Sequence, residues 1–192
     1  MIDRPKHIPG RVQAAHEISK QFSFEMACKD RTGALLRTLA ATKPGGQILE
    51  LGTGTGVGTA WILDGMDSSA HLITVDRDKD TSDLARQVVG EDARVDLIVA
   101  DVASWLKEYD GAPFDMVFVD TWRGKFIDRA ELLRRLAPGG IYFGDDLLPQ
   151  PTWDPEQPAL VDSFLREIVE DSDLAVTMMN WSSGLVLAAK QK

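Results

Sequence analysis

The sequence predicts a single α/β domain with a mostly parallel, seven-stranded sheet, helices on both faces and an antiparallel hairpin at its C-terminal end. Strand-like and helix-like stretches alternate along the chain, which is typical of a parallel sheet covered by helices. Residues 114–119 form a near-continuous apolar run, as expected for a strand buried on both faces. Two late strand-like stretches flank the turn Ser182-Ser183-Gly184, and strands joined by a tight turn must be antiparallel.

Glycines and apolar spacing mark the elements of the first half of the chain. Gly52 ends the first strand, Gly65 closes the helix after it, and Gly90 ends a helix in which Leu84 and Val88 are spaced i,i+4. In order, we expect helices within 11–42, broken near 28–33, then a strand at 47–51, a helix at 57–66, a strand at 71–75, a helix at 81–89, a strand at 94–100 and a helix at 103–108.

The second half continues the alternation and ends with the hairpin. A helical stripe of Leu160, Phe164 and Ile168 predicts one helix, and the Pro-Gly-Gly run at 138–140 predicts a turn. The expected elements are a strand at 114–119, a helix at 126–137, a strand at 141–143, a proline-rich loop at 149–158, a helix at 156–170 and strands at 174–179 and 185–189. We therefore expect one domain over 1–192, with 1–42 as a helical cap.

Composition and charge exclude several classes of protein. The chain has 192 residues, 44% hydrophobic and 27% charged, which is ordinary globular composition. Its single cysteine, Cys28, allows no internal disulfide and is expected to be a small buried residue. No apolar run approaches the roughly 20 residues of a membrane span, and 1–7 contains no apolar stretch suited to a signal peptide. We therefore expect a cytoplasmic protein that does not bind membranes.

The net charge is −9, and the basic residues are scattered, so no basic stripe suited to nucleic acid is present. A small, neutral or cationic partner molecule fits this negative net charge better, and no nucleic-acid partner is expected.

The strongest functional signal is the run from Glu50 to Gly58, in which four glycines alternate with other residues. A glycine-rich turn between strand and helix lets a ligand approach the backbone and the N–H groups of the helix. The dinucleotide fingerprint G-x-G-x-x-G fails here, because its sixth position is Val57 or Thr59. An acid at Glu50 would repel a pyrophosphate but suits a cation such as a sulfonium. The expected ligand-binding residues are Glu50, Gly52, Thr53, Gly54, Gly56, Val57 and Gly58.

Acidic residues follow the second and third strands as well. Asp76, with Arg77 beside it, lies 24 residues after Gly52, and a carboxylate there can accept hydrogen bonds from ribose hydroxyls. Asp101 could accept from an adenine amino group with Val102 beside the ring, or it could cap the helix that follows. Both roles for Asp101 remain open.

Carboxylates also follow the fourth and fifth strands. Asp120, Asp145 and Asp146 should share one crevice, because ligands bind outside the carboxyl ends of parallel strands. Three oxygen ligands suit Mg²⁺ or Ca²⁺, although Asp145 or Asp146 could instead only cap the turn. Asp120 is also expected to lie beside the ligand of the glycine loop.

Taken together, these segments resemble the catechol O-methyltransferase family, including its caffeoyl-CoA branch. The resemblance runs from about residue 32 to residue 190. It rests on the segments 32–36, 50–54, 72–76, 114–120, 136–140, 144–146 and 184–187. It implies a Rossmann-like class I methyltransferase fold, S-adenosyl-L-methionine as cofactor, and a homodimer.

The resemblance also implies a metal and a general base. Asp120 and Asp145 match family metal ligands, while Asp146 stands where the family has Asn. The family base is a Lys shortly after the strand-four Asp; here that region holds Arg123, which stays protonated, and Lys125. Lys125 is therefore the expected base, or no base is present, and Arg123 is expected as a fixed positive charge.

The expected function is O-methyl transfer to a small, phenolic or catechol-like acceptor, with assistance from a divalent metal. Trp122, Trp153, Trp181 and Met26 are candidate walls of the acceptor site. Three alternatives remain: a metal-independent methyltransferase for another small acceptor, a non-catalytic S-adenosylmethionine-binding protein and, more distantly, a dehydrogenase.

Overall fold

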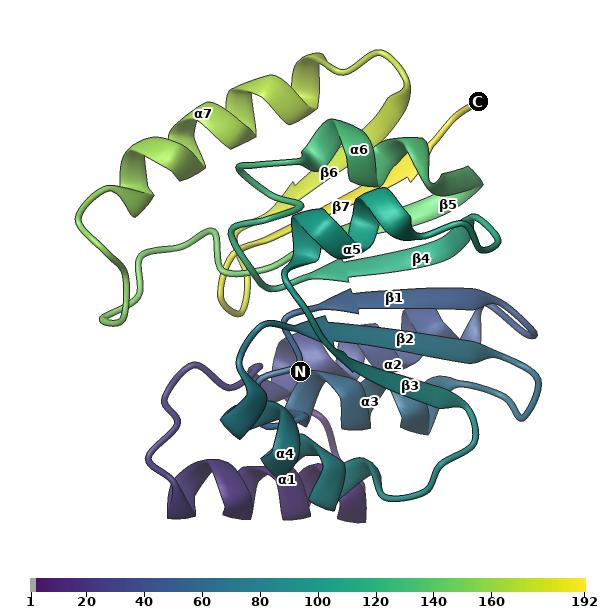
Figure 1. Cartoon of the computed structure of the whole chain (residues 1–192). Helices are drawn as coiled ribbons and strands as arrows, with labels where there is room; N and C mark the ends of the chain where they lie inside the picture. The colour runs from purple at the N-terminus through teal and green to yellow at the C-terminus, as the bar shows by residue number, and fades with distance from the viewer. Residues whose placement is uncertain (1–2) are drawn as a thin grey trace.

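A computed structural model describes residues 3–192. Residues 1 and 2 lie outside the described residues, although the expected domain and the N-terminal stretch expected to lack a signal peptide both include them. Its centre is a seven-stranded sheet in the order β3-β2-β1-β4-β5-β7-β6 (Figure 1). Strands β1 to β5 are mutually parallel, and β7 runs antiparallel to both β5 and β6. The strands are β1 Gln47–Leu51, β2 His71–Asp76, β3 Val95–Val99, β4 Phe114–Val119, β5 Leu136–Gly144, β6 Leu174–Met179 and β7 Leu185–Lys190. The predicted sheet and its terminal hairpin are confirmed.

Helices cover both faces of this sheet, as expected. The first four lie on one face and the last three on the other (Figure 1). The helices are α1 Gly10–Gln21, α2 Asp30–Ala41, α3 Val57–Gly65, α4 Lys79–Val89, α5 Val102–Glu108, α6 Arg129–Arg134 and α7 Gln157–Glu170. Among the described residues, no helix combines the length and the apolarity needed to cross a membrane.

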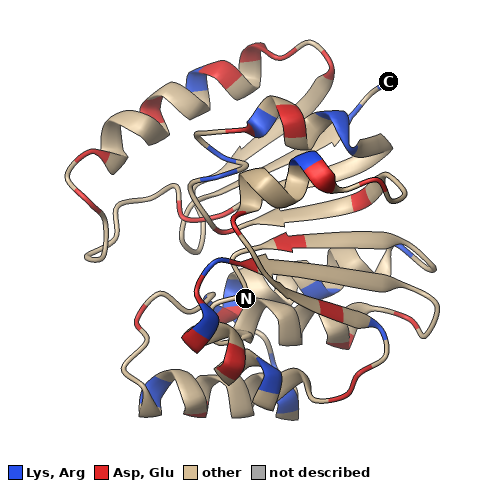
Figure 2. Cartoon of the chain, viewed as in Figure 1, with Lys and Arg blue, Asp and Glu red and all other residues tan. Residues whose placement is uncertain are grey.

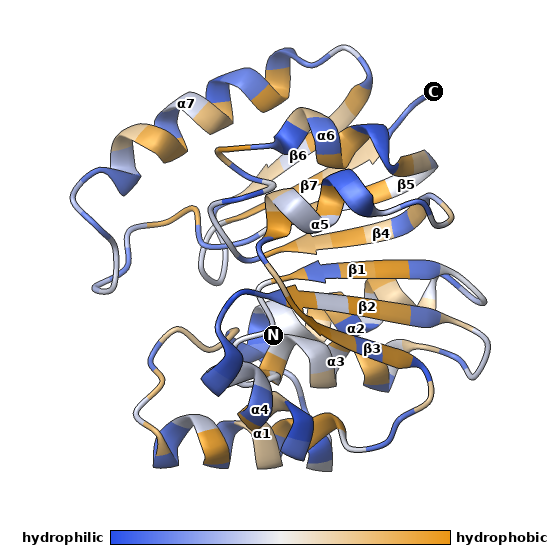
Figure 3. Cartoon of the chain, in the orientation of Figure 1, coloured by the Kyte–Doolittle hydropathy of each residue, from blue (hydrophilic) through white to orange (hydrophobic). Residues whose placement is uncertain are grey.

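Alternation along the central strands divides the core into two layers. In β1, Ile48 belongs to the hydrophobic cluster beneath α1–α4, whereas Leu49 and Leu51 belong to the cluster beneath α5–α7. In β4, Phe118 and Val119 divide in the same way. Because both faces are covered, these strands are apolar along almost their whole length, which Figure 3 shows as orange ribbons.

The N-terminal helices are held on α3 by a close approach between helices. A Cβ atom at Gly33 of α2 would lie 2.0 Å from the indole of the fully buried Trp61 in α3. Glycine is therefore required where α2 crosses α3. This packing fixes the α2 end of the connection between α1 and α2, residues 22–29, and residues of this connection line the cavities at the carboxyl ends of the strands.

Three expected boundaries were wrong. The break in the N-terminal helices, expected near 28–33, lies at 22–29, and Gly33 is inside α2. The helix expected at 126–137 is shorter, because residues 122–128 form a turn in which Asp128 adopts a positive φ of 62°. The strand expected at 141–143 begins earlier, at Leu136, which pairs with Phe114 of β4 before the ladder shifts register and resumes at Ile141. Sheet pairing, rather than helical periodicity, therefore determines the structure at 136–140.

Candidate active site

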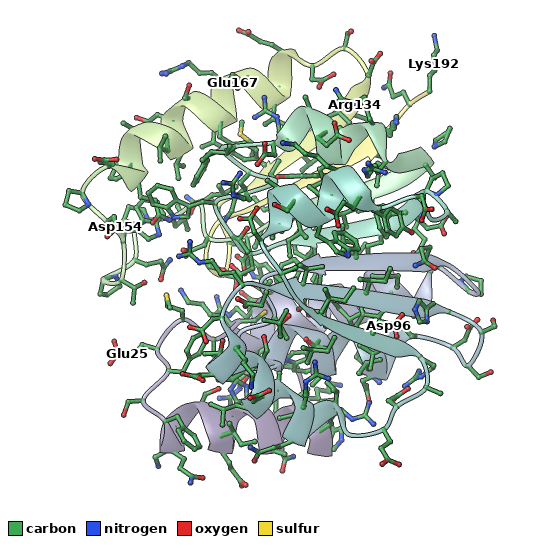
Figure 4. The ribbon with its side chains drawn as sticks, viewed as in Figure 1. Glu25, Asp96, Arg134, Asp154, Glu167 and Lys192 are labelled. Carbon is green, nitrogen blue, oxygen red and sulfur yellow. The ribbon has the colours of Figure 1, made fainter. Side chains whose placement is uncertain are left out.

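The loops at the carboxyl ends of β1, β2, β4 and β5 surround three adjoining cavities. Acidic residues, red in Figure 2, occur in several of these loops. Glu25 and Asp154, labelled in Figure 4, lie on this side of the molecule and both line the same cavity. The site therefore occupies the edge of the sheet that the strand-end acids predicted.

The first cavity, about 230 Å³, lies on the glycine loop. Gly52 has a φ of +100°, and a Cβ atom there would lie 2.8 Å from the carbonyl oxygen of Asp120. Glycine thus lets the β1 loop run directly against the end of β4. Of the expected loop residues, six line this cavity: Glu50, Gly52, Thr53, Gly54, Val57 and Gly58.

Gly56 has a different role from the one expected. It precedes α3 with a φ of +86°, and a Cβ atom there would lie 3.2 Å from the Cβ of Ala85 in α4. It does not line the cavity. The glycine is needed for the left-handed turn into α3 and for the close packing of α4, and its expected contact with the ligand stays a prediction.

Glu50 is fully buried, and only one of its two carboxylate oxygens accepts hydrogen bonds. Its Oε2 accepts hydrogen bonds from the hydroxyl groups of Thr59 and Thr74, the latter at 2.7 Å. Its Oε1 has no hydrogen-bond partner among the described residues, and Gly58 leaves room for that atom. Burial raises the pKa of Glu50 to about 7, and the two hydroxyl groups oppose this rise. An unpartnered buried carboxylate oxygen beside a cavity is suited to a cationic ligand group.

Asp76 holds the glycine loop and lines two cavities. Its Oδ2 accepts from the backbone N–H of Gly54 at 2.9 Å, and its Oδ1 accepts from the N–H of Asp78 at 3.0 Å. Each oxygen keeps a second lone pair for a ligand hydroxyl. Asp76 and Arg77 both line the first cavity and a neighbouring cavity of about 480 Å³.

The neighbouring cavity contains the residues expected near an adenine ring. Asp101 and Val102 both line it. Asp101 caps α5 by accepting from the N–H of Ser104 at 3.0 Å, and this hydrogen bond lowers the pKa of Asp101. The capping role is thus present, and the other carboxylate oxygen lies 3.5 Å from Arg123.

Arg123 lines this neighbouring cavity. It does not line the cavity that contains Lys125, which is described next. Its guanidinium donates to Asp128 in addition to its contact with Asp101. Arg123 was expected as a fixed positive charge near the acceptor; in the structure these two carboxylates hold it in the neighbouring cavity, which Trp122 also lines.

A further cavity, about 210 Å³, adjoins the first one. Both are lined by Met26, Ala27, Cys28, Asp120 and Thr121. Trp122 and Trp153 form walls of the second cavity, as expected, and Lys125 lines it. Trp181 was expected there but lies elsewhere, where its indole N–H donates to Asp3 at 2.7 Å.

The three expected metal ligands share this second cavity but are not arranged as a metal site. Asp145 Oδ1 accepts from the hydroxyl of Ser183 and from the N–H of Asp146 at 2.7 Å. Asp146 Oδ2 accepts from the indole N–H of Trp153 at 3.0 Å. Within residues 3–192, no three His, Cys, Asp or Glu side chains form a group that could hold a metal ion. These residues therefore do not fit the expected Mg²⁺ or Ca²⁺ site.

Sequence reasoning missed several residues of the site. Phe24 lies against Gly54, where a Cβ atom would be 3.1 Å from its ring, and Cys28 is buried, as expected, but between the first two cavities. Gln157 and Ser183 line the acceptor side from α7 and the β6–β7 turn. No motif signals these residues, because loops and chain segments far apart in sequence bring them to the site.

Comparisons with known proteins agree with this arrangement. A family model described as a methyltransferase domain matches residues 49–147. A Mycobacterium tuberculosis protein named as a probable O-methyltransferase is 36% identical over 117 residues. The match covers 57% of this chain and 51% of that protein. Catechol O-methyltransferase B of Danio rerio is 26% identical over 147 residues, 71% of this chain and 56% of that protein. The chain thus spans about half the length of the first curated relatives it matches.

Solved structures share the fold. The O-methyltransferase TomG of Streptomyces achromogenes, in complex with S-adenosylmethionine, has a TM-score of 0.83 at 23% identity, covering 97% of this chain and 92% of TomG. An O-methyltransferase of Bacillus cereus in complex with S-adenosylhomocysteine has a TM-score of 0.85 at 18% identity, covering 97% and 93%. At these identities the likeness concerns the fold alone. The family match covers more than half of the chain, including β1, the glycine loop and the ends of β4 and β5, and the chain belongs to the methyltransferase domain family.

Proposed function

We propose that the protein transfers the methyl group of S-adenosylmethionine to an oxygen atom of a small acceptor. The observation that carries this proposal is the joining of two cavities at Asp120, Thr121 and Met26–Cys28. One cavity has the features of a site for a cationic nucleoside, and the other has aromatic walls. Two reactants bound side by side in this way gain much of their rate from proximity and orientation.

The residues of the glycine-loop cavity and of the neighbouring 480 Å³ cavity fit the cofactor. The free Oε1 of Glu50 would face its positively charged methionine part, Asp76 would accept from the ribose hydroxyls, and Asp101 with Val102 would receive the adenine. Bound there, the cofactor supplies a methyl group on a sulfonium; transfer forms a bond from carbon to the acceptor oxygen and breaks the carbon–sulfur bond, whose electron pair stays on sulfur.

A phenolic or catechol-like acceptor fits the second cavity best. Trp122 and Trp153 offer flat aromatic faces, and Met26 offers a flexible apolar one. The name of the Danio rerio relative supports the same class of acceptor. The chain's part is to bind the ring and to hold its hydroxyl oxygen toward the first cavity. The hydroxyl proton passes to solvent at the mouth of the cavity.

Calorimetry followed by turnover tests this proposal. S-adenosylmethionine or S-adenosylhomocysteine should bind with a dissociation constant near 1 µM, roughly −8 kcal/mol, whereas NAD should not bind. A panel of phenols and catechols should then yield S-adenosylhomocysteine in amounts that match the methylated product. Binding without turnover of any acceptor would favour a non-catalytic S-adenosylmethionine-binding protein. Binding of NAD alone would reject both readings.

Assembly and location remain predictions. We expect a homodimer working in the cytoplasm, as the resemblance and the composition suggest. Light scattering over a range of protein concentrations measures the assembly, and a constant monomer mass would contradict the dimer.

A further inference from the structure

Lys125 is a buried cation in the wall of the acceptor cavity. Its side chain is 2% exposed, although it lies in the turn between β4 and α6. The ammonium group donates to the carbonyl oxygen of Asp145 at 2.6 Å and lies 5.6 Å from the centre of the Phe126 ring. A buried ammonium is costly unless it is paired and hydrogen-bonded. Its position between the ends of β4 and β5 is therefore held by specific contacts.

Asp120 and Asp145, at the ends of β4 and β5, line the same cavity as this ammonium. Desolvation and the neighbouring Asp145 raise the pKa of Asp120, while the positive charge of Lys125 opposes that rise. Burial raises the pKa of Asp145, and Lys125 again opposes the effect, together with hydrogen bonds from Ser183 and the N–H of Asp146. Lys125 is thus the positive charge that compensates the acids where a metal was expected.

The ammonium has donors to spare. A lysine ammonium carries three N–H donors, and among residues 3–192 its one hydrogen-bond partner is the carbonyl of Asp145. Lys125 also lines the cavity that we assign to the acceptor. The remaining donors can therefore point to an acceptor oxygen.

We infer that the Lys125 ammonium stands in place of a divalent metal ion: it compensates the carboxylates at the ends of β4 and β5 and donates hydrogen bonds to the acceptor oxygen, so that the reaction needs no metal. This inference rests on the proposed methyl transfer. A metal ion bound in this cavity would lie beside the positive charge of Lys125. In this role Lys125 donates hydrogen bonds and is not the general base.

Metal binding can be measured without an acceptor. The whole chain, with saturating S-adenosylhomocysteine, is titrated with Mn²⁺ and followed by electron paramagnetic resonance; its melting temperature is measured in 5 mM Mg²⁺ and in chelator. We expect no Mn²⁺ binding below millimolar concentrations and equal melting temperatures. Micromolar Mn²⁺ binding that Asp145→Asn abolishes would overturn the inference, even if no acceptor is found.

Turnover tests the second half of the inference. With any acceptor that the panel identifies, the rate should be unchanged in chelator. Lys125→Met should lower kcat by about 100-fold or more, as for loss of one donor to a developing oxyanion, while calorimetry shows unchanged affinity for S-adenosylhomocysteine. Lys125→Arg, which keeps the charge and donors, should retain more activity than Lys125→Met. The control Lys107→Met, on the exposed side of α5, should behave as the original protein.

Either of two results would overturn this half: loss of turnover in chelator, or Lys125→Met with undiminished kcat. If Lys125→Met does not fold, Lys125→Arg and the chelator measurement still decide. Failure of every acceptor in the panel would count against the proposed function, whereas the Mn²⁺ titration would still judge the role of Lys125.

Discussion

The replacement of Glu50 by Gln should remove a pH dependence of stability that the buried carboxyl group imposes. Burial raises the pKa of Glu50 from 4.5 to about 7 in the folded protein. In the unfolded chain the group ionises near 4.5, so the unfolded state loses this proton first as the pH rises. The folded state is therefore favoured below pH 4.5, and the advantage is lost as the pH rises to about 7.

The size of the effect follows from the same values. At 1.36 kcal/mol per pKa unit, a rise from 4.5 to about 7 costs the folded state about 3 kcal/mol at pH 8. A glutamine amide is close in shape, and its oxygen can accept from Thr59 and Thr74 as Oε2 does. Glu50→Gln should therefore be more stable than the original protein at pH 8, and the difference should shrink toward pH 5.

Urea unfolding of the ligand-free protein between pH 5 and pH 8.5 measures this difference directly. Glu170→Gln, an exposed position at the end of α7, is the matched control and should follow the original protein at every pH. Parallel stability curves for Glu50→Gln and the original protein would refute the reasoning. The same variant should bind S-adenosylmethionine more weakly at pH 8, because the negative charge that faces the cation is gone.

Three further predictions concern the site and the packing that supports it. Asp76→Ala should weaken S-adenosylmethionine binding by about 1–3 kcal/mol, the range for lost hydrogen bonds to a charged group; calorimetry giving unchanged affinity would contradict the assigned ribose contact. Gly33→Ala should destabilise the fold by about 1–3 kcal/mol through overpacking against Trp61, whereas Gly10→Ala, with open space around its Cβ position, should not; equal melting temperatures for both would disprove the close approach. Trp153→Ala should raise KM for the acceptor with little change in cofactor affinity; an unchanged KM would remove Trp153 from the acceptor wall.

The sequence alone predicted most of the architecture, because the signals are local. Apolar runs at β1 and β4 reflect strands covered on both faces, and their bounds agree with the structure. The glycines at 52 and 54 mark backbone with positive φ, which the residue type itself reveals. The acids at the ends of β2, β3, β4 and β5 were expected to lie near one another, because parallel strands end at the same edge of the sheet. Where local signals competed, at 126–140, long-range pairing with β4 prevailed over helical periodicity.

Only the tertiary structure decided what the polar side chains at the site do. The hydrogen bonds on which the inferred role of Lys125 depends join Asp145 to Ser183, 38 residues away, and Lys125 to Asp145, 20 residues away. The direction of Arg123 depends on Asp101 across the cavity, and that of Trp181 depends on Asp3, at the other end of the chain. Spacing in the sequence shows that such residues end near the same edge of the sheet. It does not show which donor meets which acceptor, because that depends on loop paths fixed by packing between distant elements.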